Sequence, residues 1–168
     1  GARTLSCTGK ATITNMGAEL GATTSIFPYD ESMARYLRAT NRPGLADAAN
    51  DYADMLRADD EVEADPASYF DQVVEIDLST LEPHIVGPHS PDRARPISHM
   101  AGEVADSSNS FVDDLSSALI GSCTNSSYED MSRSADVAEQ AAAHGLNSAV
   151  PFMVTPGSEQ VRATIERD

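Results

Sequence analysis

Residues 119–130 read Leu119-Ile120-Gly121-Ser122-Cys123-Thr124-Asn125-Ser126-Ser127-Tyr128-Glu129-Asp130, and this stretch decides the fold. A short apolar run gives way to small, polar, turn-forming residues, and a helical pattern begins at about Tyr128. The pattern predicts a strand, a turn and a helix N-terminus, with Cys123 at the bend. Because open α/β sheets bind ligands at the carboxyl ends of their strands, Cys123 is either a functional thiol or a buried structural residue.

The residues that follow this stretch repeat the same kind of pattern. A helix is expected over residues 128–144, capped by Asn125, Ser126 or Ser127 and ended by Gly145. A second strand is expected over residues 150–155, and a second helix over residues 158–167, which Ser158 can cap. Strand, helix, strand and helix in this order predict parallel strand pairing and an α/β fold class.

The first part of the chain mixes helical and strand patterns. We expect helices over residues 10–20, 31–39 (capped by Asp30) and 45–57, and strands over residues 23–27 and 71–78. The acidic run at residues 59–65 predicts a solvated loop. Proline and glycine are dense between residues 83 and 96, which predicts a linker or an extended crossing between domains.

The composition excludes several classes of partner. The net charge of −16 argues against nucleic acid and anionic membranes, since both would repel the chain. No apolar run is long enough to span a bilayer. The chain has 16 Asp, 11 Glu and 10 Arg but only one lysine, Lys10. Such an acidic, lysine-poor surface suits high salt, so we expect a halophilic cytoplasm, with an ordinary acidic protein as the alternative.

The two cysteines and four histidines form no metal-binding or disulfide pattern of their own. Cys7 and Cys123 lie far apart without a Cys-x-x-Cys pair, which favours a reducing compartment over a disulfide scaffold. The histidines lack the spacing of metal ligands. Asn15 and Glu19 stand four residues apart, so a helix would place them on one face, where spacing alone predicts an exposed polar pair.

Three stretches, in the same order along the chain, resemble the aconitase family, in particular its mitochondrial-type members. They are SCTGKATITNMGAE at residues 6–19, GSCTNSSYED at residues 121–130, and TPGSEQVRATIERD at residues 155–168. Residues 71–88 (DQVVEIDLSTLEPHIVGP) are similar too. The resemblance covers nearly the whole chain and weakens over residues 41–70 and 89–117.

The resemblance implies an iron–sulfur centre. Cys123 corresponds to one of three thiolates that hold a [4Fe–4S] cluster in the family, and the other two come from a Cys-Gly-Pro-Cys motif that this sequence lacks. Three thiolates leave one iron open as a Lewis acid for a substrate oxygen. Cys7 lies outside the family's ligand set, so we expect it to be a buried small residue.

The resemblance also implies roles for the polar residues. Asn15 corresponds to a residue that hydrogen-bonds near the cluster, and Glu19 to one that contacts the water or hydroxyl at the open iron. Hydrogen bonds tune a cluster's potential, and a carboxylate there can handle the proton of the hydroxyl. We expect Ser122, Thr124 and Asn125 to support the cluster through their N–H groups and hydroxyls.

The activity implied by the resemblance is the interconversion of citrate and isocitrate through cis-aconitate. Residues 1–83 would end the family's second domain, residues 84–114 would form a Pro/Ser-rich crossing, and residues 115–168 would begin the third domain. The chain starts without Met inside a motif and stops after a helical pattern. We therefore expect an internal portion of a larger enzyme, inactive alone, whose partners are the tricarboxylate substrate and the remaining polypeptide.

Other interpretations stay open. Homoaconitase and the large subunit of isopropylmalate isomerase share the Ser-Cys-Thr-Asn core, although residues 126–130 fit the mitochondrial type better. An RNA-binding regulator on the same scaffold is disfavoured by the negative charge. A scaffold or interaction domain without chemistry is the third alternative. For location, a mitochondrial matrix is the alternative to the cytoplasm.

Overall fold

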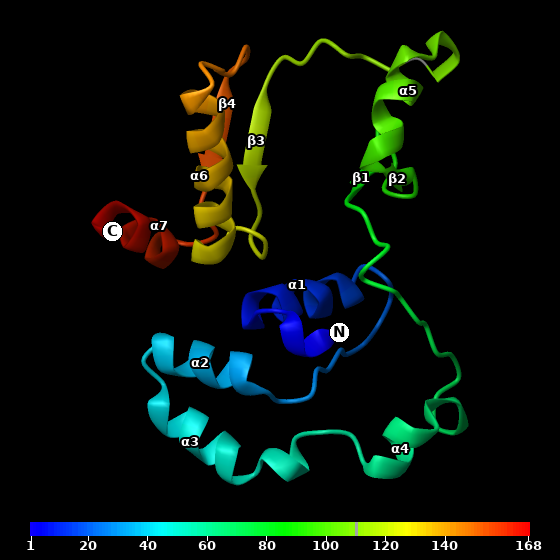
Figure 1. Cartoon of the computed structure of the whole chain (residues 1–168), viewed down its shortest axis with the longest axis vertical. Helices are drawn as coiled ribbons and strands as arrows, with labels where there is room; N and C mark the ends of the chain where they lie inside the picture. Colours follow the sequence, from blue (N-terminus) through cyan, green and yellow to red (C-terminus); the bar gives the residue numbers. More distant parts are fainter. Residues whose placement is uncertain (110) are drawn as a thin grey trace. The chain divides into compact units, whose positions relative to one another are not determined.

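The computed structural model describes residues 1–109 and 111–168, and the chain divides into two compact units (Figure 1). The larger unit contains Gly1–Val73, Leu119–Asn147 and Met153–Asp168. The smaller unit contains Val74–Ala118 and Ser148–Phe152. The family-based domain boundaries stay a prediction beside this division.

The last fifty residues form the strand–helix–strand–helix unit that the sequence predicts. The elements are β3 (Ala118–Gly121), α6 (Tyr128–Ala143), β4 (Phe152–Thr155) and α7 (Glu159–Arg167). β3 and β4 pair in parallel, with α6 running back between them (Figure 1), which confirms the α/β fold class. Gly145 has a φ of 71° and follows α6 directly after its C-cap, as its sequence position predicts.

The first helices of the larger unit are set by their caps. α1 (Cys7–Gly17) begins and ends three residues earlier than predicted, because the Ser6 Oγ accepts the Gly9 N–H at 3.1 Å and so starts the helix. α2 (Glu31–Ala39) matches its prediction, and the Asp30 carboxylate caps it as expected.

Two further helices differ from the sequence-based expectation. α3 (Pro43–Asp51) is shorter than predicted: Pro43 opens it, and after Asp51 the chain continues in a 3-10 turn. A short helix, α4 (Asp60–Ala64), forms where the sequence predicted a solvated loop. Acidic side chains in its first turn stabilise it, because they lie at the positive end of the helix dipole. α2 packs against α3, and each contributes one fully buried alanine, Ala34 and Ala46.

The smaller unit contains a hairpin within the segment predicted as a crossing. β1 (His84–Val86) pairs antiparallel with β2 (Ala94–Pro96), and His84 lies opposite Pro96. α5 (Met100–Ala105) follows. Residue 110 of the predicted crossing lies outside the described residues. Short 3-10 helices span Ala2–Thr4, Ala53–Met55, Pro66–Ser68, Ile97–His99 and Ser107–Asn109.

Two predicted strands, at residues 23–27 and 71–78, are wrong: neither segment forms a strand in the described structure. A strand needs a partner for its backbone N–H and C=O groups, and an apolar pattern alone does not supply one. Val74 and Ile76 consequently remain 79% and 61% exposed. Among the described residues, no helix has the length and apolar character needed to cross a bilayer.

Candidate functional site

The loop of residues 122–127 joins β3 to α6 and closes on itself through two serine side chains. Ser126 is fully buried, and its Oγ accepts the Ser122 backbone N–H at 2.6 Å. The Ser122 Oγ in turn accepts the N–H groups of Thr124 at 3.2 Å and Asn125 at 3.3 Å. These bonds satisfy backbone donors within the loop and fix its path.

Cys123 is a free and exposed cysteine of this loop. Its Sγ lies 3.6 Å from the Thr124 Oγ1, and Thr124 is half-buried. An exposed thiol is open to an external ligand, whereas a buried structural cysteine is inert. Of the two sequence-based alternatives for Cys123, the exposure favours the functional one.

α6 begins directly after the loop with a capping box. The Ser127 Oγ accepts the Asp130 N–H at 3.3 Å, and the Asp130 carboxylate accepts the Ser127 N–H at 3.1 Å. Of the cap candidates that the sequence offered, the cap is therefore Ser127. Ser126 and Asn125 have other tasks, since Ser126 closes the loop and Asn125 contacts α1.

Gly157, in the turn after β4, holds the loop from its other side. Its N–H donates to the Ser126 carbonyl at 2.9 Å. A Cβ at this position would lie 3.0 Å from the Ser126 oxygen and 3.3 Å from the Cys123 oxygen. Both neighbours are backbone atoms, so a side chain here would force the loop to shift by a few tenths of an ångström, and glycine avoids that shift.

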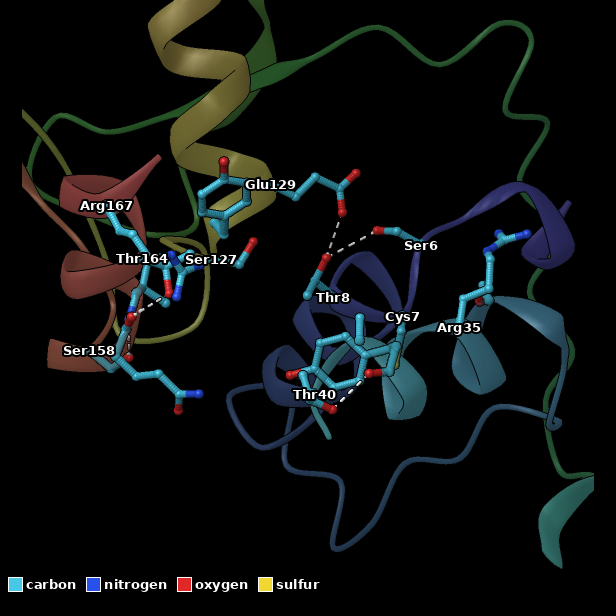
Figure 2. A pocket seen from close by; sticks show the side chains of 16 residues that line it. Ser6, Cys7, Thr8, Arg35, Thr40, Ser127, Glu129, Ser158, Thr164 and Arg167 are labelled. Carbon is cyan, nitrogen blue, oxygen red and sulfur yellow. Dashed lines mark hydrogen bonds between the residues drawn. The ribbon is translucent and has the colours of Figure 1, made fainter. Parts of the chain in front are cut away.

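α1 is tied to the loop and to α6 by two threonine side chains. The Thr8 Oγ1 donates to the Glu129 Oε2 at 2.7 Å (Figure 2), and the Thr12 Oγ1 donates to the Asn125 Oδ1 at 2.7 Å. The hydroxyls of Thr8 and Ser6 stabilise the ionised Glu129, so its pKa lies below the usual value. These bonds join segments more than a hundred residues apart in the sequence.

α1 is also anchored to α2 through the single lysine. Lys10 is only 3% exposed; its Nζ pairs with the Asp30 carboxylate and donates to the Ser32 Oγ at 2.8 Å. Desolvation raises the pKa of Asp30, but hydrogen bonds from Lys10, Ser32 and the Met33 N–H outweigh it and lower the pKa to about 2. The charged pair thus joins α1 to the N-cap of α2.

Asn15 and Glu19 lie farther along the same helix and its continuation. Asn15 is in the last turn of α1, whereas Glu19 lies two residues beyond its end, in a turn closed by the Glu19 N–H donating to the Met16 carbonyl at 3.1 Å. Both side chains are exposed. Within the described residues, no hydrogen bond joins either of them to Cys123.

The larger unit also contains a cavity of about 650 Å³ (Figure 2). Its lining comes from the starts of α1 and α6, from one side of α2 and from α7 along its length, and includes Cys7, Arg35, Glu129 and Arg167. Cys123, Asn15 and Glu19 are not among the lining residues. This cavity is therefore separate from the residues that the resemblance assigns to chemistry.

Comparison with known proteins identifies the family. The model of the aconitase family (aconitate hydratase) matches residues 1–168, which is the whole chain. This chain belongs to the aconitase family.

The relatives agree with this assignment. The chain is 55% identical, over its full length, to a mitochondrial aconitate hydratase of Gracilaria gracilis and 59% identical to one of Saccharomyces cerevisiae. It is 53% identical to a mitochondrial homocitrate dehydratase of Saccharomyces cerevisiae. The chain spans about a fifth of the length of these relatives, covering 20% or 21% of each.

This aconitase-family chain supplies one thiol that suits a metal centre. Among the described residues, no three His, Cys, Asp or Glu side chains gather closely enough to hold a metal ion. Cys123 is exposed on a braced loop, whereas Cys7 is half-buried and burial raises the pKa of its thiol. A raised pKa disfavours the thiolate that binds metals. Cys7 is thus less buried than predicted, yet poorly suited to ligation.

Sequence reasoning missed several residues that shape the loop. Gly157, Thr8, Thr12 and the closing role of Ser126 were not predicted. The parallel strand order gave one usable signal, since the turns after β3 and β4 must meet at the same edge of the sheet. That rule places Gly157 near Cys123. Nothing local in the sequence marks the two threonines, because each is also compatible with an ordinary helix surface.

Proposed function

We propose that this chain is the part of an aconitate hydratase that presents Cys123 as one of three thiolate ligands of a [4Fe–4S] cluster. The observation that carries the proposal is the exposure of Cys123 on a loop whose backbone is held by Ser122, Ser126 and Gly157. The match of the whole chain to the aconitase family supports it. The resemblance implies that the other two ligands come from a Cys-Gly-Pro-Cys motif that this sequence lacks, so we expect the 168 residues alone to be inactive.

A bound cluster would supply an open iron that acts as a Lewis acid toward a hydroxyl and a carboxylate of the tricarboxylate substrate. With a cluster in place, Glu19, exposed beyond α1, would orient that hydroxyl and hold its proton. Asn15 would provide a hydrogen bond near the cluster and so tune its potential. Ser122, Thr124 and Asn125 hold the backbone on both sides of the Cys123 thiolate.

The test compares two single-atom changes in the full-length protein after reconstitution with iron and sulfide. Cys123→Ser is expected to lose the visible absorbance of the cluster and the conversion of citrate to isocitrate. Cys7→Ser is the matched control, because Cys7 is half-buried and lies outside the loop, and it is expected to keep both. A Cys123→Ser protein that retains its colour and turnover would refute the proposal.

A second candidate substrate has specific support. One relative, 53% identical over the chain, is a homocitrate dehydratase. The two activities differ by one methylene in the substrate, which a binding pocket distinguishes only modestly. Measuring kcat/KM for citrate and for homocitrate with the full-length protein decides between them. A preference for homocitrate would replace the substrate assignment and leave the role of Cys123 unchanged.

Two observations favour different cellular locations for this protein. The relatives are named as mitochondrial enzymes, which supports the mitochondrial matrix. The net charge of −16 and the single lysine support a halophilic cytoplasm instead. We favour the matrix alternative on the relatives. The salt dependence of stability, described below, tests whether the acidic surface is an adaptation to high salt.

A further inference from the structure

Four residues at spacings of four, three and four define one side of α1 and its continuation: Thr8, Thr12, Asn15 and Glu19. At 3.6 residues per turn these positions share one face. The first two contact the segment that carries Cys123, and the last two are the residues proposed to act on the substrate and the cluster. We call this set the α1 stripe.

Both hydroxyls of the stripe make short bonds to that segment. The Thr12 hydroxyl has one proton, and its 2.7 Å contact with the Asn125 Oδ1 is shorter than its 3.2 Å contact with the Thr8 carbonyl. Thr8 bonds the Glu129 Oε2, while Arg133 donates to the Glu129 Oε1 at 2.7 Å. Glu129 is therefore held from two sides, and bonds to an ionised acceptor are the stronger kind.

Rotation of α1 is fixed by a contact from a different face. Lys10 follows Thr8 by two residues, which is about 200° around a helix. Its buried Nζ is bonded to Asp30 and Ser32 of the α2 N-terminus. With Lys10 held on one side and the two threonines on another, α1 can neither roll nor slide without breaking one of these bonds.

We propose that Thr8 and Thr12 are positioning residues that set the register of α1 against the Cys123 loop, and thereby place Asn15 and Glu19 relative to the centre that Cys123 ligates. The inference rests on the proposed function for the roles of Cys123, Asn15 and Glu19. Neither threonine touches the substrate or the reacting atoms. They act through the 2.7 Å bonds to Asn125 and Glu129.

The experiment uses three variants of the full-length protein. Thr12→Val removes the hydroxyl and keeps the shape, Thr12→Ser keeps the hydroxyl, and Thr14→Val is the matched control. Thr14 lies on the same helix, and its Oγ1 donates to the Ala11 carbonyl at 3.0 Å without reaching the loop. Thr8→Val provides an independent second disruption should Thr12→Val fold poorly.

The first measurement needs no cluster and follows hydrogen exchange of the Thr124 and Asn125 amides in the metal-free protein, because both amides are bonded within the held loop. Losing one hydrogen bond corresponds to about fivefold in an equilibrium between held and open loops. Thr12→Val is therefore expected to raise the exchange rate of these amides about fivefold, with Thr12→Ser and Thr14→Val near wild type. Equal exchange rates in Thr12→Val and Thr14→Val would overturn the inference.

The second measurement separates positioning from general stability in the reconstituted enzyme. Thr12→Val is expected to lower kcat with little change in KM, because Thr12 touches no substrate and acts through the positions of Asn15 and Glu19, and Thr12→Ser is expected to restore kcat. An equal loss in Thr12→Val and Thr14→Val, or no rescue by serine, would overturn positioning. Failure of the proposed function is distinguishable, since it appears as an active Cys123→Ser protein while the hydrogen-exchange result for the loop still stands.

Discussion

Residues 118–121 and residues 71–78 carry comparable apolar patterns, yet they behave differently. The first segment forms β3 and pairs with β4, and the loop that follows is fixed by hydrogen bonds from Ser122, Ser126 and Gly157. The second segment forms no strand, and Val74 is 79% exposed. The difference shows that an apolar pattern makes a segment compatible with a strand, but the strand forms only where another segment pairs with its backbone.

The contrast also separates two sources of stability. Around α1 and the Cys123 loop, stability comes from polar contacts within this chain, which range from exposed (Thr12 to Asn125) to buried (Lys10 to Ser32). Around residues 71–78, apolar side chains are exposed and contribute no burial energy until another segment covers them. Substitutions in α1 or the Cys123 loop should therefore lower local stability directly. Substitutions in residues 71–78 should lower stability only if another segment covers that surface.

The largest effect is expected for the buried ion pair. Asp30→Ala removes the N-cap acceptor of α2 and leaves the Lys10 charge, only 3% exposed, without its partner. We expect a loss of about 3 kcal/mol in the local stability of α1 and α2, measured by hydrogen exchange in the full-length protein. The double variant Lys10→Met/Asp30→Asn removes the charge and keeps a capping side chain, so it should lose less. An equal loss of stability in Asp30→Ala and in the double variant would show that the unpaired Lys10 charge is not the cause.

The next effect concerns the closure of the loop. Ser126→Ala leaves the half-buried Ser122 N–H bond without its acceptor, and the loss of such a bond costs about 0.5–1.5 kcal/mol. Hydrogen exchange of the loop amides should report this loss. Ser132→Ala is the control, because the Ser132 Oγ only donates to the Tyr128 carbonyl within α6. Equal hydrogen-exchange protection of the loop amides in Ser126→Ala and Ser132→Ala would show that Ser126 does not stabilise the loop.

A substitution in the exposed apolar segment, residues 71–78, tests whether another segment covers it. Val74→Thr keeps the shape of the side chain and adds a hydroxyl. If further chain covers residues 71–78, the full-length protein should lose about 1–2 kcal/mol, the usual cost of burying an unpaired hydroxyl. Denaturant unfolding measures it. An unchanged midpoint would mean that this surface stays exposed and that the segment has no partner.

The pH dependence follows from Asp30. Its pKa is lowered to about 2 in the folded chain, so its contribution is present above the unfolded pKa and is lost as the pH falls through about 2. After allowance for solvent at the carboxylate, we expect about 1–2 kcal/mol to disappear between about pH 4 and pH 2. Asp30→Asn should flatten this slope. The same slope in both proteins would contradict the assignment.

The smallest effect is expected from salt. The net charge of −16 repels itself, and raising the ionic strength from about 0.15 M to about 1 M shortens the screening length from about 8 Å to about 3 Å. The melting temperature should therefore rise by a few degrees, provided that the acidic surface belongs to a protein adapted to salt. A fall in melting temperature with KCl would instead favour an ordinary acidic protein.

Local rules predicted the elements whose causes are local. Asp30 and Ser158 cap the helices that the sequence assigns to them, Gly145 follows α6, and the order of elements gives the parallel pair. The predicted strand at residues 71–78 is wrong because no described segment pairs with it, and pairing is not a local property of a sequence. The same limit explains why Gly157 was not found, since its task depends on a contact with a distant loop.

The candidate site divides in the same way. The family motif names Cys123, Asn15 and Glu19, and their roles stay predictions. What the motif did not name are the contacts that bring those residues' elements together, such as the Thr12 bond to Asn125. A motif records which residues take part in chemistry. The side chains that align two elements carry no chemical signature, and only the three-dimensional arrangement reveals them.

The bond from the Gly157 N–H to the Ser126 carbonyl also has a consequence for the order of biosynthesis. A nascent polypeptide that has reached residue 150 already contains Cys123, but it lacks both β4 and the amide that fastens the loop. The thiol is therefore translated well before its surroundings are complete. Under the proposed ligand role, iron and sulfide that reach the chain before residue 157 has been added would meet a cysteine whose loop lacks this bond.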